Sequence, residues 1–352
     1  MAQMFENLLR EHVKRLVFRP DQPFESAVKK DGSILLNANE NPFGSPAGLD
    51  YHRYSEKDMV SFLTQVAQVK RVHAQQICLA NGTEMLLSRI ISAFCEPAED
   101  NILVCTPTSA IYERVAMLQN VQVKKVPLDS AFQPDIEAIA QQVDYFTKAI
   151  ILCSPNNPTG NAAHFHNIEV LLNNFDGILV VDEAYINFSR QRSLVGSLEE
   201  YPNLIVLQTL SIAWGLAGLR IAMAIAQRDL AAILNQLGTV HTSISQPAIA
   251  IASQAIEQLE LINSRIKDIV ALRNYFANRL ADLPLIECVY PSDANFLLVK
   301  CRVQAATVIG FLKAAGILVG IVPDLPYCIR ITVGTLQENE LLLEQLQRFE
   351  VH

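Results

Sequence analysis

The sequence predicts an α/β fold, in which a mostly parallel, doubly wound, seven-stranded sheet forms a large domain that is joined to a smaller α/β domain. Between about residues 77 and 226, short β-branched apolar runs alternate with segments of helical apolar periodicity, which is typical of βαβ units. Several of these runs are apolar on both faces, as strands covered by helices on both sides must be. A chain of 352 residues, half of them hydrophobic, also exceeds what one compact core organises.

Seven apolar runs are the expected strands of the large sheet. They are Ile77–Ala80, Asn101–Cys105, Val121–Val126, Lys148–Cys153, Ile178–Asp182, Leu204–Gln208 and Arg220–Ala226. The expected division is an N-terminal arm with part of the small domain over residues 1–45, a large domain over 46–245, a long connecting helix over 246–283 and a small C-terminal domain over 284–352. The connecting helix is predicted because this stretch has no proline after Pro247 and no glycine before Leu283.

Composition excludes several classes of function. A net charge of -8 and a pI near 5.4 argue against a nucleic-acid surface, which needs clustered Lys and Arg. The apolar runs are too short to span a bilayer, and the mixed N-terminus does not match a signal peptide, so we expect a cytoplasmic protein that does not bind membranes. The seven cysteines are scattered without a C-x-x-C pair, so we expect no disulfide framework and no metal site.

Polar residues collect directly after the expected strands, where open α/β sheets bind ligands. The first strand is followed by Asn81-Gly82-Thr83 at a helix start, where backbone N–H groups and the helix dipole suit a phosphate. The same triplet is also an ordinary turn with a helix cap, which is the favoured interpretation of it alone. A stiff loop, Ser154-Pro155-Asn156-Asn157-Pro158-Thr159-Gly160, follows the fourth strand and suits either a fixed amide side chain or a structural role.

Two further strand ends carry charged or hydroxyl side chains. Asp182 ends an apolar strand in Asp182-Glu183-Ala184-Tyr185, so its carboxylate either faces the surface or pairs with a cationic ring nitrogen of a cofactor. The sixth strand runs into Thr209-Leu210-Ser211-Ile212-Ala213-Trp214-Gly215 and on to Arg220. Ser211 and Arg220 could complete a phosphate site.

These segments together resemble the histidinol-phosphate aminotransferases, in order and spacing, over nearly the whole chain. The narrower signals are Asn-Ala-Asn-Glu-Asn-Pro-Phe-Gly at residues 37–44 and Arg-Ile-Thr-Val-Gly-Thr at residues 330–335. Ser-Pro-Asn-Asn-Pro-Thr-Gly is shared by many class I and II aminotransferases. The resemblance implies a fold-type I enzyme that uses pyridoxal 5'-phosphate (PLP) in histidine biosynthesis.

The resemblance also implies a role for individual residues. Asp182 would pair with the PLP ring nitrogen, and Asn157 and Tyr185 would hydrogen-bond its phenolic oxygen. Arg330 would take the substrate carboxylate through a bidentate fork. The phosphate would be held by residues from several loops, with Tyr54 supplied by the other subunit of a homodimer; the remaining phosphate residues would be Gly82, Thr83, Ser211 and Arg220. Ser109 would face the cofactor ring, and Asn39 and Asp21 would face the substrate.

Ile212 stands where the family has the lysine that forms the internal Schiff base with PLP and then moves the α-proton of the substrate. Ser211 precedes it and Arg220 follows eight residues later, as the family pattern requires, so the register is correct. An isoleucine has no nitrogen to form an imine and no lone pair to act as a base. Its presence should remove several orders of magnitude of rate, and it predicts that PLP binds without a covalent bond.

Other departures lie around the same pocket. Ser109 replaces an aromatic ring that stacks on PLP, and Asp21 replaces the tyrosine of an N-terminal Pro-Tyr. Gly82-Thr83-Glu84-Met85 replaces Gly-(Ser/Ala)-Asp-Glu, His241-Thr242 replaces a second Pro-Tyr, and Ile221-Ala222 replaces Ile-Gly.

Three functional hypotheses follow. The first is reversible amino transfer between L-histidinol phosphate, or a related amino acid, and 2-oxoglutarate. The second is a catalytically impaired or inactive family member that acts as a dimeric scaffold binding PLP, a phosphorylated ligand or a protein. The third is a PLP reaction that does not need the lysine and uses a group such as His241 as the base, although His241 also fits a plain pocket wall.

Overall fold

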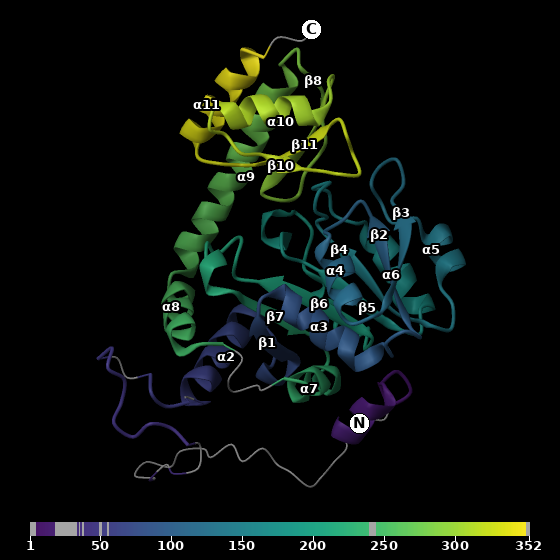
Figure 1. Ribbon diagram of the computed structural model, residues 1–352, viewed down its shortest axis with the longest axis vertical. Coiled ribbons are helices and arrows are strands. Elements are labelled where there is room, and N and C mark those ends of the chain that lie inside the picture. Colours follow the sequence, from purple (N-terminus) through teal and green to yellow (C-terminus); the bar gives the residue numbers. More distant parts are fainter. Residues whose placement is uncertain are drawn as a thin grey trace.

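The computed structural model describes residues 5–17, 34, 36, 39–48, 51–54, 56–238 and 244–349. Figure 1 shows two bodies, a large one around a central sheet and a smaller one at the C-terminal end of the chain, with α8 and α9 running between them. None of the described helices is long and apolar enough to cross a membrane. Within the described residues, no three His, Cys, Asp or Glu side chains are grouped so as to hold a metal ion.

The large body contains a seven-stranded sheet with the order β1-β7-β6-β5-β4-β2-β3. Only β7 runs antiparallel to its neighbours, so the predicted mostly parallel sheet is confirmed. The strands are β1 (Ile77–Asn81), β2 (Asn101–Thr106), β3 (Gln122–Pro127), β4 (Thr147–Cys153), β5 (Ile178–Asp182), β6 (Leu204–Thr209) and β7 (Ile221–Ile225). Each predicted strand therefore matches an observed one to within two residues at either end.

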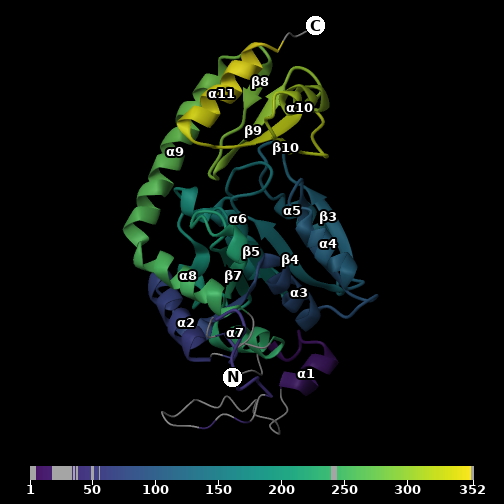
Figure 2. The same cartoon turned by 60° about the vertical axis from the view of Figure 1, so that its left-hand side comes forward.

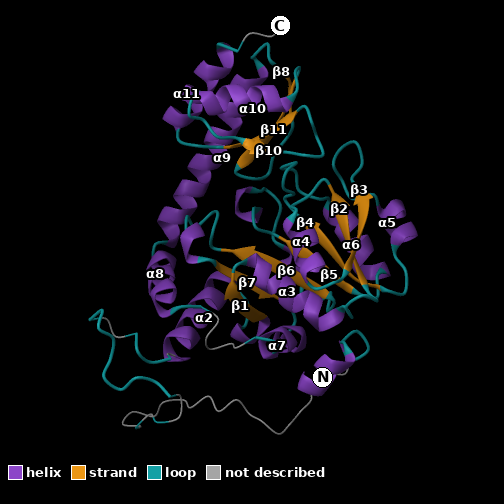
Figure 3. Ribbon diagram, viewed as in Figure 1, coloured by secondary structure: helices purple, strands orange, loops and turns teal. Residues whose placement is uncertain are grey.

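Helices cover both faces of this sheet, as the two-sided apolar pattern of the strands requires (Figure 3). One face packs against α2 (Glu56–Lys70), α5 (Ile136–Gln142), α6 (Phe165–Asn174) and α8 (Gln246–Glu257). The other packs against α1 (Glu11–Val17), α3 (Thr83–Phe94), α4 (Ile111–Leu118) and α7 (Arg228–Gln236). Alternate residues of each strand enter the two cores, so the central strands β5 and β6 are buried along their whole length.

The segment predicted to be one connecting helix is two helices, because Gln258 leaves the helical conformation at φ -101° and ψ 33°. The first, α8, packs against α2 on the large sheet, whereas α9 (Leu259–Ala281) continues to the small body (Figure 2). The first turns of α9 still pack against the large body through Ile262, whereas its last turns pack into the small body through Phe276 and Leu280. No glycine or proline marks the break, which is why the sequence pattern did not predict it.

The small body is a four-stranded antiparallel sheet with the order β10-β11-β9-β8, covered by α9 and two further helices. Its elements are β8 (Ile286–Val289), β9 (Phe296–Cys301), α10 (Ala305–Ala314), β10 (Gly320–Ile321), β11 (Cys328–Thr332) and α11 (Leu336–Gln347). Thr335 and Glu338 form a reciprocal capping box at the start of α11, in which each side chain accepts a backbone N–H of the other residue.

The strand order places the functional segments at one edge of the large sheet. The chain passes from β2 to the edge strand β3 and then crosses back over β2 to β4. From β4 it proceeds to β5, away from β2. The connections that follow β2 and β4 therefore leave in opposite directions. Such a switch point leaves a crevice at the carboxyl ends of the strands. Asn156 bridges the two loops, because its amide Oδ1 accepts from Thr108 Oγ1 at 2.8 Å and its Nδ2 donates to the Pro107 carbonyl at 2.9 Å.

Phe276 tests the packing of the small body. Its ring is fully buried between α9 and the small sheet, so Phe276→Ala should lower the free energy of unfolding by about 3–5 kcal/mol. Urea unfolding monitored by circular dichroism measures the change. The exposed Asn274 on the same helix supplies the control, since Asn274→Ala should change stability by less than about 0.5 kcal/mol. Equal effects of the two substitutions would contradict this packing.

Candidate active site

Asp182 ends β5 with a buried carboxylate. Tyr112 donates its hydroxyl to Oδ2 at 2.9 Å, and the Ala184 backbone N–H donates to Oδ1 at 3.1 Å. Burial raises the pKa of Asp182 from its usual 3.8 to about 6, while these two hydrogen bonds oppose that rise and the nearby Glu84 carboxylate adds to it. Among the described residues, no cationic side chain forms an ion pair with Asp182. A positively charged ligand nitrogen would supply the missing partner.

Asn157 and Tyr185 lie together at the same strand ends, and Arg330 reaches them from the small sheet. Asn157 Nδ2 donates to the Tyr185 hydroxyl at 3.1 Å, and Arg330 Nη1 donates to Asn157 Oδ1. Phe296 of β9 supports both partners, because its ring packs edge-on against Tyr185 at 5.1 Å and lies 5.7 Å from the Arg330 guanidinium. Burial raises the pKa of Tyr185 well above its usual range, so its hydroxyl is a proton donor at neutral pH.

The turn after β1 and the loop after β6 form a second polar cluster around Arg220. Gly82 has φ +87°, which favours glycine, and a Cβ built there would lie 2.6 Å from Arg220 Nη2. Thr209 Oγ1 and Ser211 Oγ lie 2.9 Å apart, and Thr83 begins α3. The guanidinium, the hydroxyls and the helix N-terminus together suit an anion.

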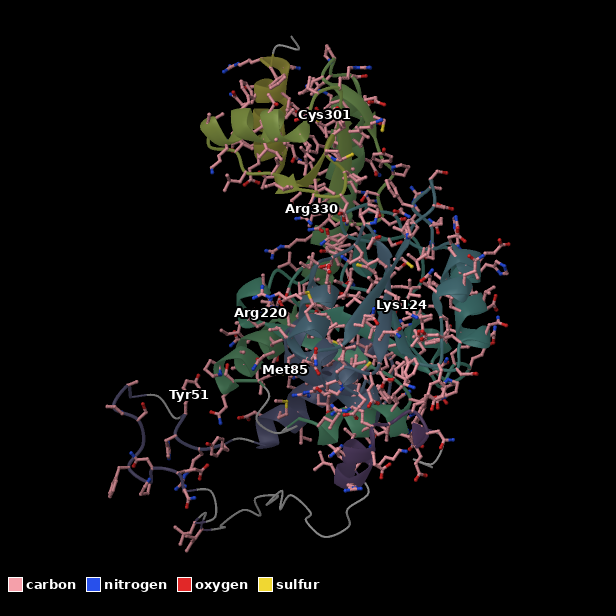
Figure 4. The ribbon with its side chains drawn as sticks, turned by 45° about the vertical axis from the view of Figure 1, so that its right-hand side comes forward. Tyr51, Met85, Lys124, Arg220, Cys301 and Arg330 are labelled. Carbon is pink, nitrogen blue, oxygen red and sulfur yellow. The ribbon has the colours of Figure 1, made fainter. Side chains whose placement is uncertain are left out.

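Arg220 itself holds a left-handed backbone at φ 56°, which costs a non-glycine residue about 1 kcal/mol or more. In this structure its Nη2 is paired with the Glu84 carboxylate at 2.8 Å. Figure 4 shows Arg220 on the large body above Met85, the residue after Glu84, and Arg330 at the edge of the small body that faces the large one. The two guanidinium groups therefore lie on different bodies of the molecule.

Ile212 lies in the turn between Thr209 and Leu216, where the Gly215 N–H donates to the Ile212 carbonyl at 3.1 Å. Its side chain is partly buried and provides no nucleophile or base. Lys70 of α2 lies on the face of the sheet where Trp214 packs, with Nζ 5.8 Å from the centre of the Trp214 ring. Burial lowers the pKa of Lys70 to about 8, an effect that the Glu183 carboxylate on that face opposes.

Among the other residues expected at the site, Tyr54 and Asn39 lie in an exposed N-terminal segment. Tyr54 is two-thirds exposed, and its backbone N–H donates to Glu40 at 2.6 Å. Asn39 is exposed next to Glu40, and Figure 4 shows Tyr51 of the same segment well apart from Arg220 and Arg330. Asp21 and His241 lie outside the described residues. Ser109 is partly buried just before α4, and its side chain makes no hydrogen bond among the described residues.

Sequence reasoning missed Tyr112 and Phe296. Tyr112 lies in the first turn of α4, three residues after Ser109, and its ring is fully buried. A tyrosine just after a strand-end loop was the available signal, but its partner Asp182 is 70 residues away along the chain. Phe296 looked like an ordinary core residue because it begins a strand in an apolar run.

Residues 21–346 match the model of the family "Aminotransferase class I and II". The chain is 37% identical to a histidinol-phosphate aminotransferase of Parabacteroides distasonis over 352 aligned positions, with 98% of this chain and 99% of the relative covered. The enzyme of that name in Cytophaga hutchinsonii is 35% identical, with 99% of this chain and all of the relative covered. The chain belongs to the histidinol-phosphate aminotransferase family.

Solved structures show the same fold. A histidinol-phosphate aminotransferase of Sinorhizobium meliloti in complex with PLP superposes with a TM-score of 0.78 at 23% identity, with 88% of this chain and 89% of that chain covered. One of Clostridium acetobutylicum also gives a TM-score of 0.78, at 21% identity, covering 85% of this chain and 90% of that one. The fold-type I architecture predicted from the sequence is confirmed.

The pocket of this aminotransferase family member fits PLP at most points of contact. The buried Asp182 carboxylate lacks a cationic partner among the described residues, which suits a protonated ring nitrogen. Asn157 and Tyr185 offer donors for a phenolic oxygen, and the Gly82 turn brings the Arg220 guanidinium beside the N-terminus of α3, which suits an anion. At the position of the family lysine the fit fails, because Ile212 cannot bond to the cofactor.

The raised pKa of the buried Asp182 carboxyl predicts that the free energy of unfolding of the ligand-free protein depends on pH. Its pKa is raised on folding, so the folded chain binds the proton more tightly than the unfolded chain, and stability falls as pH rises from about 4 to about 6. A shift of this size corresponds to at most about 3 kcal/mol. Asp182→Asn should therefore stabilise the PLP-free protein by roughly 1–3 kcal/mol at pH 7.5 and have little effect near pH 4.

Urea unfolding of both proteins without PLP, at the two pH values, measures this difference. Asp144 provides a control, because its carboxylate is exposed and hydrogen-bonded to Lys124 and its pKa lies below the usual value. Asp144→Asn should not stabilise the protein at pH 7.5. A stability difference between wild type and Asp182→Asn that is the same at both pH values would show that the carboxylate ionises without cost.

Proposed function

We propose that this chain is a homodimeric PLP-dependent aminotransferase of the histidinol-phosphate type. The reaction would exchange an amino group between L-histidinol phosphate, or a related amino acid, and 2-oxoglutarate, as a step of histidine biosynthesis in the cytoplasm. The observation that carries the proposal is the full-length similarity to enzymes of that name, at 35–37% identity, combined with the convergence of four family residues at one site. Those residues are Asn157, Asp182, Tyr185 and Arg330.

PLP, when bound, supplies an electron-withdrawing ring that stabilises negative charge at the substrate α-carbon. Asp182 would hold the ring nitrogen in its protonated form, because a buried carboxylate without a cationic partner gains strongly from one. Tyr112 would keep that carboxylate oriented through the 2.9 Å hydrogen bond to Oδ2. Asn157 Nδ2 and the Tyr185 hydroxyl would donate to the phenolic oxygen at the ring edge.

Arg330 would bind the carboxylate of the 2-oxo acid. In the ligand-free structure one of its donors is used by the Asn157 carbonyl oxygen, and the guanidinium lies 5.7 Å from the Phe296 ring centre. A carboxylate arriving there would find a planar, pre-oriented fork of donors. Because Asn157 belongs to the large body and Arg330 to the small one, substrate binding would act on the contact between the two bodies.

The missing amine limits this reaction. Ile212 can neither attach the cofactor nor move a proton, so PLP would be held by non-covalent contacts alone and turnover would be slow. The similarity to named enzymes supports the amino-transfer hypothesis and gives no support to a non-catalytic scaffold. Tyr54 is exposed on the segment that the family pattern assigns to the partner's phosphate site, which agrees with a homodimer.

Placing a lysine at position 212 tests the proposed amino-transfer function. Ile212→Lys should raise the rate of 2-oxoglutarate-dependent amino transfer from L-histidinol phosphate by roughly 100- to 10,000-fold, since a positioned base contributes about that much. It should also produce a visible absorbance band with PLP and, after borohydride reduction, a cofactor mass on the peptide containing position 212. Ile212→Met, which has similar volume and no amine, should give neither effect.

The same experiment identifies a substitute base if there is one. Wild-type turnover as fast as that of Ile212→Lys would show that another group does the work, and a reduced cofactor on the Lys70 peptide would identify that group. No product from Ile212→Lys with any amino donor would count against amino transfer as the function.

Arg330 can be tested in the Ile212→Lys background. Arg330→Lys keeps the charge but removes the planar fork, so KM for 2-oxoglutarate should rise roughly 10- to 100-fold, the equivalent of one charged hydrogen bond. Steady-state kinetics at saturating amino donor measures it. Arg348→Lys, an exposed change at the far end of the small body, is the control and should leave KM unchanged. An unchanged KM in Arg330→Lys would place the carboxylate elsewhere.

A further inference from the structure

Glu84 occupies the anion cluster around Arg220. It is the second residue of α3, and its Oε2 lies 2.8 Å from Arg220 Nη2, a residue 136 positions away along the chain. A Cβ built on Gly82 would lie 2.9 Å from the same Glu84 oxygen and 2.6 Å from Arg220 Nη2. The carboxylate and the guanidinium therefore lie directly over the glycine turn, in space that a side chain at position 82 would otherwise fill.

The negative charge of Glu84 also affects Asp182, a residue outside the ion pair with Arg220. Burial is the main cause of the raised pKa of Asp182, and repulsion by the Glu84 carboxylate adds to it, so the two carboxylates lie close enough to interact. A phosphate placed on Arg220 and the N-terminus of α3 would enter the same environment with about two further negative charges. Arg220 is the only cation that forms an ion pair with Glu84 among the described residues.

We propose that Glu84 is an internal competitor for the ligand phosphate at Arg220, an inference that rests on the proposed PLP-dependent function. Phosphate binding displaces the Glu84 carboxylate from Arg220 into solvent and lowers the affinity by the cost of that exchange. The side chains of Arg220 and Glu84 are 49% and 51% exposed, so the carboxylate can leave by rotating and without being buried elsewhere. The cost is therefore modest and measurable, not prohibitive.

An ordinary structural role for Glu84 makes a different prediction. A glutamate in the first turn of a helix stabilises the helix dipole whether or not it touches Arg220. In that case Glu84→Gln would lower stability slightly and leave phosphate affinity unchanged or reduced. A helix-stabilising role alone therefore does not predict that removing the carboxylate charge tightens phosphate binding.

The experiment compares full-length wild type, Glu84→Gln and a control, Glu287→Gln. Glu287 pairs with Lys300 on the small sheet at 2.7 Å and is similarly exposed, so its substitution removes the same charge at a remote place. Three probes are titrated: PLP, pyridoxal without the phosphate, and inorganic phosphate. Fluorescence of Trp214, the single tryptophan, reports on the first two and calorimetry on the third. Thermal melts confirm that all three proteins are folded.

Competition predicts that Glu84→Gln binds PLP and inorganic phosphate roughly two- to fivefold more tightly than wild type, the range expected for a partly exposed charge pair. The gain should shrink in high sodium chloride, where such charges are screened. Pyridoxal affinity and the Glu287→Gln protein should be unaffected.

The probes separate failure of this inference from failure of the proposed function. Equal affinities of wild type and Glu84→Gln for PLP and phosphate would overturn the role of Glu84 and leave the cofactor assignment standing. A gain for inorganic phosphate without any binding of PLP would support competition and overturn the cofactor. A gain that pyridoxal shares equally would overturn competition at the phosphate, and no binding of any probe by either protein would overturn both.

Discussion

The site depends on one constraint of the parallel sheet, which is that its central strands are buried on both faces and therefore apolar along their length. Polar and charged side chains of the site therefore lie at the ends of the strands. Asp182 is the clearest case, because it is the only ionisable residue of β5 and it ends the strand. Burial there gives the carboxylate a raised pKa and makes a cationic partner valuable. The fold and the reactive character of the site therefore have the same physical origin.

The same constraint explains how much could be predicted from the sequence. Two-sided apolar runs made the seven strands recognisable, and the residues after them included Asn157, Asp182, Tyr185 and Arg220 of the candidate site. What could not be predicted were contacts that depend on tertiary placement. Tyr112 reaches Asp182 from α4, and Phe296 supports Arg330 from the small sheet, and neither relation leaves a local pattern. The break at Gln258 likewise leaves no local pattern, because no glycine or proline marks it.

Three charged side chains of the ligand-free site have hydrogen-bond partners within the protein. Arg330 bonds to Asn157, Arg220 pairs with Glu84, and Tyr112 donates to Asp182. Each guanidinium that the family pattern assigns to an anion thus already holds an oxygen of the protein. Ligand binding in such a site is an exchange of partners, and its net free energy is the difference between two sets of hydrogen bonds. Affinity then depends on how easily each internal partner can move away.

Ile212 and Glu84 differ in this respect. Glu84 is half exposed and can rotate into water, so its effect on a phosphate is a finite free-energy difference that changes with salt and with substitution. Ile212 has no conformer that supplies a nitrogen, so motion cannot compensate for it. The first change adjusts how tightly a ligand is held, whereas the second removes a chemical group. Under the proposed function, Asn157, Tyr185 and Arg330 would keep the contacts for recognition while position 212 lacks the base, so recognition and proton transfer would be separate properties of this chain.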